Sequence, residues 1–342
     1  MVLKNLIIIA SFLSIMLVTS CGGGGGGGGG ISIQGSREVL VSDLSFPVRI
    51  GELDSEVLIF SELSTGKVST FNKKSGDVTE LIRFPGFLGS GLSISGLMVD
   101  REFERNGFVF LYHGTAELGK NVLTRLEIKN GKLAGRLQLR SFSSPSVHNG
   151  GGMYQFSNGN ILLGIGDGNN PALAQDVNRV EGKILLINRN GDLIDSSNGL
   201  PGGIYALGFR NPFGIDGDGD GVIFVADNGP ECDDKIARLV SGGNYGWRMD
   251  YQCGVNIEGH IQPEFLWAKS EGLTDILLFK GLILVPHFNT NRLLALKFTG
   301  AYSGVTEEIE LISNGTEPII DLLKTKNQEV LYTTPKGILR LK

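Results

Sequence analysis

A histidine beside a cluster of glycines is the first candidate for chemistry in this chain. His148 precedes Gly150–Gly152 in the run HNGGGMYQFSNGNILLGIGDG, and Asp167 follows inside a second glycine cluster. A neutral imidazole can act as a general base, because its ordinary pKa lies near neutral pH. A lone histidine at a turn more often bonds a nearby carbonyl, and an aspartate at a strand exit commonly caps its own turn. Both interpretations stay open on these residues alone.

An arginine next to an Asn-Pro pair is the second candidate. In YALGFRNPFGID, Pro212 restricts the backbone of Asn211 to an extended or turn geometry, which aims the side chain of Arg210. A guanidinium donates hydrogen bonds as a fork and stacks on planar rings, so Arg210 suits a planar, multiply charged ligand. An arginine that pairs with an acid at a sheet edge is the alternative.

The segment ADNGPECDDKIARLVSGGNYGW is rich in turn residues and in oxygen atoms. The backbone carbonyls of Gly229 and Pro230 follow a strand and could coordinate calcium, a cation that prefers oxygen ligands. Asp233, Asp234 and Tyr245 could add further oxygens. Composition alone favours a polar loop without a metal.

A run of alternating aspartates, DGDGDG over 216–221, begins like the calcium loop of an EF-hand. The twelfth position is Asp227 rather than glutamate, and GVIFVAD is typical of a strand with no flanking helix. We therefore expect an Asp-Gly turn in a β-hairpin, with a calcium-binding hairpin loop as the alternative.

The first thirty residues have the pattern of an export signal. Lys4 precedes LIIIASFLSIMLV, an apolar run that is short for a membrane-spanning helix, and the following VTSC ends at Cys21. VTSC resembles a bacterial lipobox, so we expect a signal peptide over 1–20 and a lipidated Cys21. The domain would then be membrane-anchored in the periplasm or at the cell surface. A secreted protein with its cysteine just inside the cleavage site is the alternative.

The rest of the chain divides into a tether and one domain. Residues 21–35 contain nine consecutive glycines and are expected to form a flexible tether to a domain over 36–342. The net charge of −5 offers no basic surface for a nucleic acid. Cys232 and Cys253 could form a disulfide in an exported protein, with two free thiols as the alternative.

A unit of two short strands recurs six times and indicates the fold. The units begin near Ser55, Asn106, Asn158, Gly219, Lys280 and Asn327. Their spacing of roughly 50 to 60 residues is typical of propeller blades. We predict an all-β, six-bladed β-propeller, in which the strand REVLVSDLSF near Glu38 completes the last blade. An eight-stranded barrel or a two-sheet sandwich fits the spacing less well. Propellers place ligands at one mouth of the central channel, on loops between blades.

Five runs, taken in order, carry a family resemblance. They are similar to the soluble PQQ-dependent glucose/sorbosone dehydrogenases, also called aldose sugar dehydrogenases, and to their hedgehog-interacting-protein-like relatives. The runs lie between Gly96 and Trp247: GLMVDREFERNGFVFLYH, HNGGGMYQFSNGNILLGIGDG, AQDVNRVEGKILLINRNG, YALGFRNPFGID and NGPECDDKIARLVSGGNYGW.

The resemblance implies a six-bladed propeller that holds pyrroloquinoline quinone (PQQ) and Ca²⁺ and oxidises an aldose sugar or related alcohol. It implies that His148 is the general base, which takes the proton of the sugar C1 hydroxyl as hydride passes to the quinone, and that Asp167 orients it. PQQ carries three carboxylates and an ortho-quinone, so it needs cations around it and a metal at the reacting carbonyl.

The resemblance also implies which residues hold the cofactor and the metal. The cofactor contacts fall at Arg210, near the quinone oxygens, and at Asn211 and Asn228. The catalytic calcium falls at the loop that contains Gly229, Pro230, Asp234 and Tyr245.

The chain departs from the family pattern at several of its cofactor positions. The family glutamine falls near Gly91, and the family lysine at or near Asn289. Two family arginines fall around Pro318 and Ile320, so three cations that would neutralise the PQQ carboxylates are missing from their usual positions. Lys235 stands where the metal loop usually has an acid.

These departures leave two alternatives for the site. His287, Arg292 or Lys235 could substitute for the missing cations and preserve the dehydrogenase. A propeller of the same ancestry that has lost PQQ would instead bind a carbohydrate or a protein partner at the same mouth. A calcium-dependent, lactonase-like hydrolase fits less well, because no matching ring of acidic ligands is present.

Overall fold

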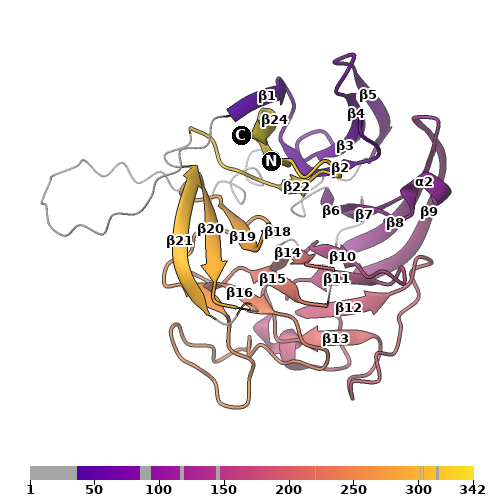
Figure 1. Cartoon of the computed structure of the whole chain (residues 1–342). Helices are drawn as coiled ribbons and strands as arrows, with labels where there is room; N and C mark the ends of the chain where they lie inside the picture. Colours follow the sequence, from indigo (N-terminus) through magenta and orange to yellow (C-terminus); the bar gives the residue numbers. More distant parts are fainter. Residues whose placement is uncertain are drawn as a thin grey trace, which may run out of the picture.

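A computed structural model of the chain describes residues 37–84, 94–115, 119–143, 147–219, 221–300, 302, 304–312 and 316–342. The expected signal peptide, the lipidation site Cys21, the glycine tether, Gly91 and Asp220 lie outside these residues. Within them, six four-stranded antiparallel sheets surround a central axis (Figure 1). The prediction of a six-bladed propeller is confirmed.

The first three blades follow one another along the chain, each from its innermost to its outermost strand. Blade 1 contains β2 (Pro47–Glu52), β3 (Val57–Glu62), β4 (Lys67–Asn72) and β5 (Val78–Arg83). Blade 2 contains β6 (Ile94–Val99), β7 (Phe108–Gly114), β8 (Lys120–Lys129) and β9 (Lys132–Ser143). Blade 3 contains β10 (Met153–Gln155), β11 (Ile161–Ile165), β12 (Lys183–Ile187) and β13 (Ile204–Leu207).

The other three blades complete the ring. Blade 4 contains β14 (Pro212–Gly217), β15 (Ile223–Asp227), β16 (Asp234–Arg238) and β17 (Phe265–Trp267). Blade 5 contains β18 (Leu277–Phe279), β19 (Leu282–His287), β20 (Arg292–Phe298) and β21 (Val305–Ile312). Blade 6 contains β22 (Leu322–Lys324), β23 (Val330–Thr334), β24 (Gly337–Leu341) and, outermost, β1 (Arg37–Val41).

Strand β1 closes the ring by joining the last blade. It pairs antiparallel with β24, so that Arg37 lies opposite Leu341 and Val41 opposite Ile338. This is the role expected of REVLVSDLSF. Closure covers the edge that β24 would otherwise expose, and it joins the first and last described strands without a covalent link.

The two faces of the propeller are defined by its innermost strands. Each innermost strand contacts the innermost strands of its neighbours around the channel. We call the face at which these strands begin the upper face and the other the lower face. The single helical turn α2 (Phe103–Asn106) and the 3-10 helix η1 (Pro171–Gln175) connect strands within blades 2 and 3. Neither helix, and no other described segment, forms a helix long and apolar enough to cross a membrane.

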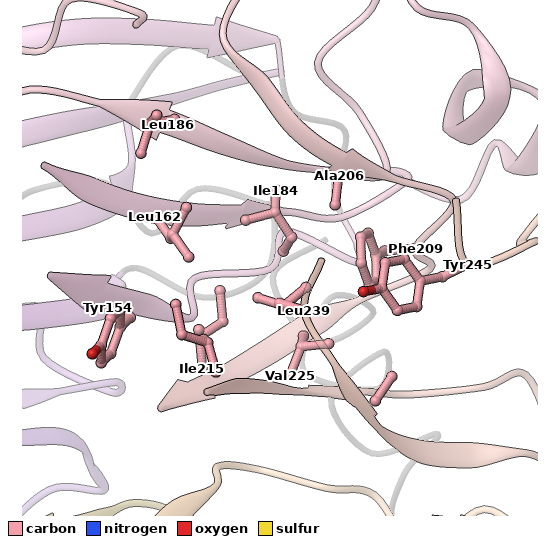
Figure 2. Packing of buried hydrophobic residues seen from close by; sticks show 12 residues of the cluster. Tyr154, Leu162, Ile184, Leu186, Ala206, Phe209, Ile215, Val225, Leu239 and Tyr245 are labelled. Carbon is pink, nitrogen blue, oxygen red and sulfur yellow. The ribbon is translucent and has the colours of Figure 1, made fainter. Parts of the chain in front are cut away.

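Apolar side chains between adjacent blades form the core. Between blades 3 and 4, Tyr154 and Leu162 face Ile215 and Val225, and Phe209 stacks on Tyr245 with ring centroids 4.5 Å apart (Figure 2). Strands buried on both faces explain the short, continuous apolar runs of the repeat, such as ILLGI and KILLI.

The DGDGDG run connects β14 and β15 in a hairpin. Within it, the N–H of Asp218 donates to the carbonyl of Val222 at 3.0 Å, and the N–H of Val222 donates to the Asp218 carboxylate. Asp216 lies in β14 and accepts a hydrogen bond from the N–H of Leu278 in blade 5. The described part of the run is therefore a hairpin turn, as expected, and its first aspartate links two blades.

The connection between β16 and β17, residues 239–264, leaves blade 4 at the lower face. It then runs along the outer edge of blade 3 toward the upper face. The N–H of Leu207 donates to the carbonyl of Gly243, and the N–H of Tyr245 donates to the carbonyl of Leu207. A parallel bridge joins Leu207 to Asn244. This path carries Trp247 from the lower end of β16 to the upper face.

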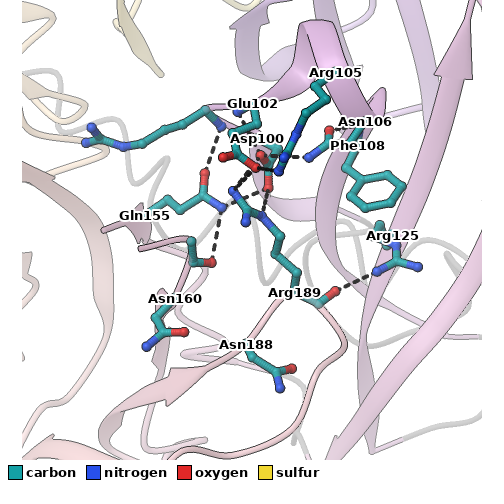
Figure 3. A network of polar contacts seen from close by, with 12 residues as sticks. Asp100, Glu102, Arg105, Asn106, Phe108, Arg125, Gln155, Asn160, Asn188 and Arg189 are labelled. Atoms are coloured by element: carbon teal, nitrogen blue, oxygen red, sulfur yellow. Dashed lines mark hydrogen bonds and ion pairs between the residues drawn. The ribbon is translucent and has the colours of Figure 1, made fainter. Parts of the chain in front are cut away.

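A buried carboxylate fastens blades 2 and 3 at the lower face. Asp100, which follows β6, accepts two hydrogen bonds from the guanidinium of Arg189, at 2.7 and 3.1 Å, and one from Gln155 at 2.8 Å (Figure 3). Burial alone would raise the pKa of Asp100, but the hydrogen bonds from Arg189 and Gln155 outweigh it and lower the pKa below its ordinary value.

We expect Asp100→Asn to lower the free energy of unfolding by about 3 kcal/mol at pH 7, because it removes one partner of a buried ion pair. The stabilisation by Asp100 is present above its unfolded pKa and is lost as pH falls through the lower folded pKa. The difference between the two proteins should therefore shrink below about pH 4. Urea unfolding measures both effects. Glu80→Gln, in an exposed pair with Arg83, is the control and should change little.

Candidate active site

His148 lies at the upper mouth, in the loop that leads into β10. Its backbone φ is 51°, and Gly150 and Gly151 follow with φ of 70° and 123°. A Cβ on Gly166 would lie 1.8 Å from the carbonyl oxygen of His148. Glycines therefore allow the loop of His148 and the loop after β11 to touch. This contact brings His148 beside Asp167.

The imidazole of His148 is paired with a buried carboxylate. Its Nδ1 lies 2.7 Å from Oδ1 of Asp167, whose side chain is fully buried, while the His148 side chain is 14% exposed. An ionised carboxylate only accepts hydrogen bonds, so Nδ1 carries the proton of the neutral ring. None of the described residues is hydrogen-bonded to Nε2. The pair can therefore accept a proton from a ligand at Nε2.

Asp167 is fixed by three further contacts. The N–H of Asn169 donates to Oδ1 at 2.8 Å, and the indole N–H of Trp247 donates to Oδ2 at 2.7 Å. The N–H of Asp167 donates to the carbonyl of Arg210 at 2.8 Å. The carboxylate thus has little freedom to rotate, and it links the histidine loop to the arginine loop of blade 4.

The Arg-Asn-Pro turn is supported from below by Asp227. Both N–H groups of Arg210 and Asn211 donate to this buried carboxylate, that of Asn211 at 2.7 Å. Burial raises the pKa of Asp227, and the ammonium of Lys235, 3.6 Å away, opposes that shift. The side-chain oxygen of Asn211 accepts a hydrogen bond from the N–H of Gly150 at 3.0 Å. The turn is therefore attached to the loop that carries His148.

The guanidinium of Arg210 supplies positive charge next to the histidine–aspartate pair. Its Nη1 donates to the carbonyl of Asn228 at 3.2 Å. Burial lowers the pKa of Arg210, and the nearby carboxylates of Asp167 and Asp227 oppose that shift. A guanidinium nevertheless stays protonated in proteins at neutral pH.

Two backbone carbonyls after β15 are available as ligands. Among the described residues, none donates a hydrogen bond to the carbonyl oxygens of Gly229 or Pro230. Gly229 itself is buried, and a Cβ there would lie 1.8 Å from the carbonyl oxygen of Cys232. Carbonyl oxygens without donors in a tight loop are suited to a hard cation.

The side chains of Asp234 and Asn228 position this loop. Oδ1 of Asp234 accepts from the N–H of Gly229, and Oδ2 accepts from the N–H groups of Glu271 and Gly272, all at 2.7 Å. The amide of Asn228 exchanges two hydrogen bonds with the backbone of Leu273. Both side chains thus tie the loop to residues 271–273, and their expected roles as metal ligand and cofactor contact stay predictions.

Tyr245 does not belong to the metal loop either. Its hydroxyl donates to the carbonyl of Arg238 and accepts from the N–H of Val240. These groups lie at the end of β16 opposite Asp234, four residues or roughly 13 Å away along the strand. Tyr245 packs in the core between blades 3 and 4 (Figure 2), which corrects its expected role as a metal ligand.

Trp247 is the site residue that sequence reasoning missed. It lies two residues after Tyr245 and is one of only two tryptophans in the chain. Its indole touches Asp167 through the N–H, and the guanidinium carbon of Arg210 lies 5.8 Å from its ring centroid. The glycines of GGNYGW could have indicated a tight turn that presents a side chain, but not where residues 239–264 would carry it.

The basic side chains on the blade 5 side of the mouth share one acidic partner. Glu271 accepts from His287 at 3.1 Å and from Arg292 at 3.2 Å. The hydrogen bond from His287, more than the charge of Arg292, lowers the pKa of Glu271 to about 2. Asn289, at the family lysine position, donates to the carbonyl of Ser270.

The positions of the two family arginines are also occupied by structural residues. Ile320 is buried in an apolar cluster with Val48 and Leu63, and Pro318 precedes it at the entrance to blade 6. Among the described residues, the three cations considered as substitutes, Lys235, His287 and Arg292, are thus all paired with a carboxylate.

Cys232 and Cys253 are joined by a disulfide, with their Cα atoms 6.0 Å apart. The bond connects the start of β16 to the excursion over 239–264. The neighbouring carboxylate of Asp233 accepts hydrogen bonds from the Tyr251 hydroxyl at 2.8 Å and the Gly254 N–H at 2.7 Å. Covalent and polar contacts together hold the part of the excursion that follows Trp247.

By its fold the protein belongs to the propellers that keep a polar site at one mouth. The sequence identifies one family among these propellers. The family model described as Glucose / Sorbosone dehydrogenase matches residues 44–300. Because this match covers most of the chain, the protein belongs to that family, and the resemblance drawn from the sequence motifs is confirmed.

Curated relatives share part of their sequence with this chain. It is 26% identical to the quinoprotein glucose dehydrogenase B of Acinetobacter calcoaceticus over 250 residues, which are 62% of this chain and 52% of that protein. It is 28% identical to the aldose sugar dehydrogenase YliI of Escherichia coli (strain K12) over 134 residues, 37% of this chain and 35% of the relative. The chain thus matches about half, or less, of the length of these relatives.

Solved structures show the same fold over nearly the whole chain. The PQQ-bound aldose sugar dehydrogenase of Streptomyces coelicolor has a TM-score of 0.80 at 20% identity, covering 91% of this chain and 98% of that one. A putative oxidoreductase (glucose dehydrogenase) of Thermus thermophilus has a TM-score of 0.82 at 22% identity, covering 90% and 100%.

We expect reduction of the disulfide to lower the free energy of unfolding by about 3 kcal/mol, since the closed loop has about twenty residues. Guanidinium unfolding with and without dithiothreitol measures the difference. The double variant Cys232→Ser, Cys253→Ser should match the reduced protein and show no response to dithiothreitol. A double variant as stable as the oxidised protein would contradict this expectation.

Proposed function

We propose that this protein oxidises the C1 hydroxyl of an aldose sugar or related alcohol, with PQQ as electron acceptor and His148 as general base. The observation that carries the proposal is the His148–Asp167 pair at the mouth, with Nε2 left for a ligand. The family match and the quinoprotein relatives support it.

The reacting half of the site fits the cofactor and its metal. The carbonyl oxygens of Gly229 and Pro230 would hold Ca²⁺, and Arg210 and Asn211 would contact PQQ. When bound, PQQ accepts the hydride from C1 and so removes two electrons from the sugar. Arg210 provides a fixed positive charge where negative charge develops.

His148 and Asp167 handle the proton. The C1 hydroxyl gives its proton to Nε2 of His148 as the C1–H bond breaks, so the sugar loses one proton and one hydride and becomes a lactone. The Asp167 carboxylate, 2.7 Å from Nδ1, stabilises the imidazolium that forms and keeps the ring in one orientation.

A second candidate function follows from the charges on the blade 5 side of the mouth. Glu271 pairs with both His287 and Arg292, and Lys235 pairs with Asp227. A ligand with three carboxylates would find few cations there. A propeller that binds a neutral carbohydrate or a protein partner at the same mouth, without PQQ, agrees with this observation.

Reconstitution separates the two candidates. The purified protein is incubated with PQQ and Ca²⁺, and dye-linked oxidation of several aldoses is measured together with the melting temperature. The dehydrogenase should gain both a PQQ-dependent rise in melting temperature and turnover. No thermal shift with micromolar PQQ, combined with a shift from a sugar alone, would favour the carbohydrate-binding propeller.

We expect His148→Asn to keep PQQ-dependent thermal stabilisation and to lower kcat by roughly 10²–10⁴, the usual contribution of a general base. Asparagine retains an N–H near Asp167 but cannot accept the proton. His260→Asn, at a half-buried histidine that bonds the carbonyl of Glu258, is the matched control and should keep full turnover. Equal losses in both variants would exclude a specific role for His148.

We also propose that the protein is an exported lipoprotein anchored through Cys21, as the VTSC motif suggests. Residue 36 joins the propeller at Arg37, and β1 starts at the lower face, where Arg37 lies opposite Leu341.

We expect Cys21→Ala to move the protein from the membrane fraction to the soluble fraction, because a stable anchor requires the lipid chains. Fractionation followed by immunoblotting measures the change. Globomycin blocks removal of a lipoprotein signal peptide. In its presence, the protein without the substitution should accumulate with its signal peptide attached. A Cys21→Ala protein that remains in the membrane fraction would contradict anchoring through this residue.

A further inference from the structure

We infer that Trp247 is a positioning residue that holds the base pair His148–Asp167 and Arg210 in one fixed arrangement. The inference concerns the same site as the proposed dehydrogenase and rests on that function for its effect on turnover. The geometry itself is independent of the proposed function.

The first observation is how the two oxygens of Asp167 are divided. Oδ1 is bonded to Nδ1 of His148, and Oδ2 accepts the indole N–H of Trp247, each at 2.7 Å. Because the Asp167 side chain is fully buried, loss of this donor would leave Oδ2 as a buried acceptor without a partner. Loss of the indole N–H would therefore favour rotation of the carboxylate, and with it a change in the hydrogen bond that sets the tautomer of His148.

The second observation is that the same indole contacts the cation of the site. The guanidinium carbon of Arg210 lies 5.8 Å from the ring centroid of Trp247, within the range of a cation–π contact. Arg210 otherwise donates to the carbonyl of Asn228. One side chain therefore touches the carboxylate through its edge and the guanidinium through its ring.

The third observation is that Trp247 is itself held from two sides. The amides of Gln175 and Asn244 exchange two hydrogen bonds, at 3.0 and 2.7 Å, and Gln175 also donates to the carbonyl of Trp247 at 2.9 Å. On the other side the ring of Tyr251 packs against the indole with centroids 5.0 Å apart. A residue held this firmly can transmit a fixed position to its partners.

A purely structural role would need only the volume of the ring. Trp247 is 6% exposed, so any large apolar side chain would fill most of the same space. The positioning role depends on the indole N–H. Removal of that N–H with the ring shape kept is therefore the decisive change.

The test compares Trp247→Phe with replacement of Trp247 by benzothienylalanine, which keeps the bicyclic shape and lacks the N–H. Heteronuclear NMR of the histidine rings, in the protein without PQQ, reports the tautomer of His148, and His148→Asn assigns the signal. Trp267→Phe is the control, since the indole N–H of Trp267 donates to Glu308 on blade 5, away from the base pair.

We expect the natural protein and Trp267→Phe to show one tautomer of His148 with the proton on Nδ1. Both Trp247 replacements should show a second tautomer or exchange broadening. In the reconstituted enzyme they should lower kcat by roughly 10- to 100-fold, as loss of groups that orient a reacting side chain does, with the KM for sugar little changed.

One outcome tests the positioning role of Trp247, and another tests the proposed dehydrogenase. If benzothienylalanine at position 247 leaves the His148 signals unchanged, Trp247 only fills space and the inference is wrong, whatever Trp247→Phe does to stability. If the signals change but neither the natural protein nor any variant oxidises a sugar with PQQ, the positioning role stands and the proposed dehydrogenase fails.

Discussion

The guanidinium of Arg49 is the contact on which the centre of this propeller depends. Arg49 lies in β2 of blade 1 and is 4% exposed. It donates to the carbonyls of Ser95 at 2.8 Å, Phe213 at 2.8 Å and Thr274 at 3.3 Å, and to the carboxylate of Asp321 at 2.6 Å. These groups belong to blades 2, 4, 5 and 6. One planar fork thus fixes the spacing of five innermost segments just below the mouth, where His148 lies.

This arrangement also determines what charge is left for a ligand. Burial raises the pKa of Asp275, and the nearby charge of Asp321 raises it further, while Arg49 opposes the shift in both acids. Below the guanidinium, a channel cavity of about 230 Å³ is lined by these groups together with Asp216 and Lys324. Arg49 lies close to the segment where the family places two arginines, but its donors are already used within the protein. It stabilises the propeller and adds no free cation at the mouth.

The sequence was sufficient to predict the six blades and the histidine–aspartate half of the site. Repeat spacing predicts six units, and the closing role of β1 follows because an unpaired edge strand is unfavourable. His148 and Asp167 could be paired from the resemblance, and glycines permit their contact. Trp247 could not be placed, since an irregular excursion has no periodicity from which its path can be read. Tyr245 was misassigned for the same reason: two residues apart in a turn, Tyr245 faces the core and Trp247 the site. Arg49 is hidden in PVRIGE, where every residue is buried.

The pairing of charges gives the two candidate functions different physical consequences. A mouth that binds a tricarboxylate contains cations without acidic partners while it is empty. The desolvation of these cations lowers the stability of the folded protein until the ligand binds. Here, without a ligand, Glu271 already pairs with His287 and Arg292, and Asp227 pairs with Lys235. Binding of PQQ would therefore gain less from charge and would rely more on calcium at Gly229 and Pro230 and on Arg210. The His148–Asp167 pair keeps its geometry either way, because Trp247 and the Arg-Asn-Pro turn, both from blade 4, contact Asp167.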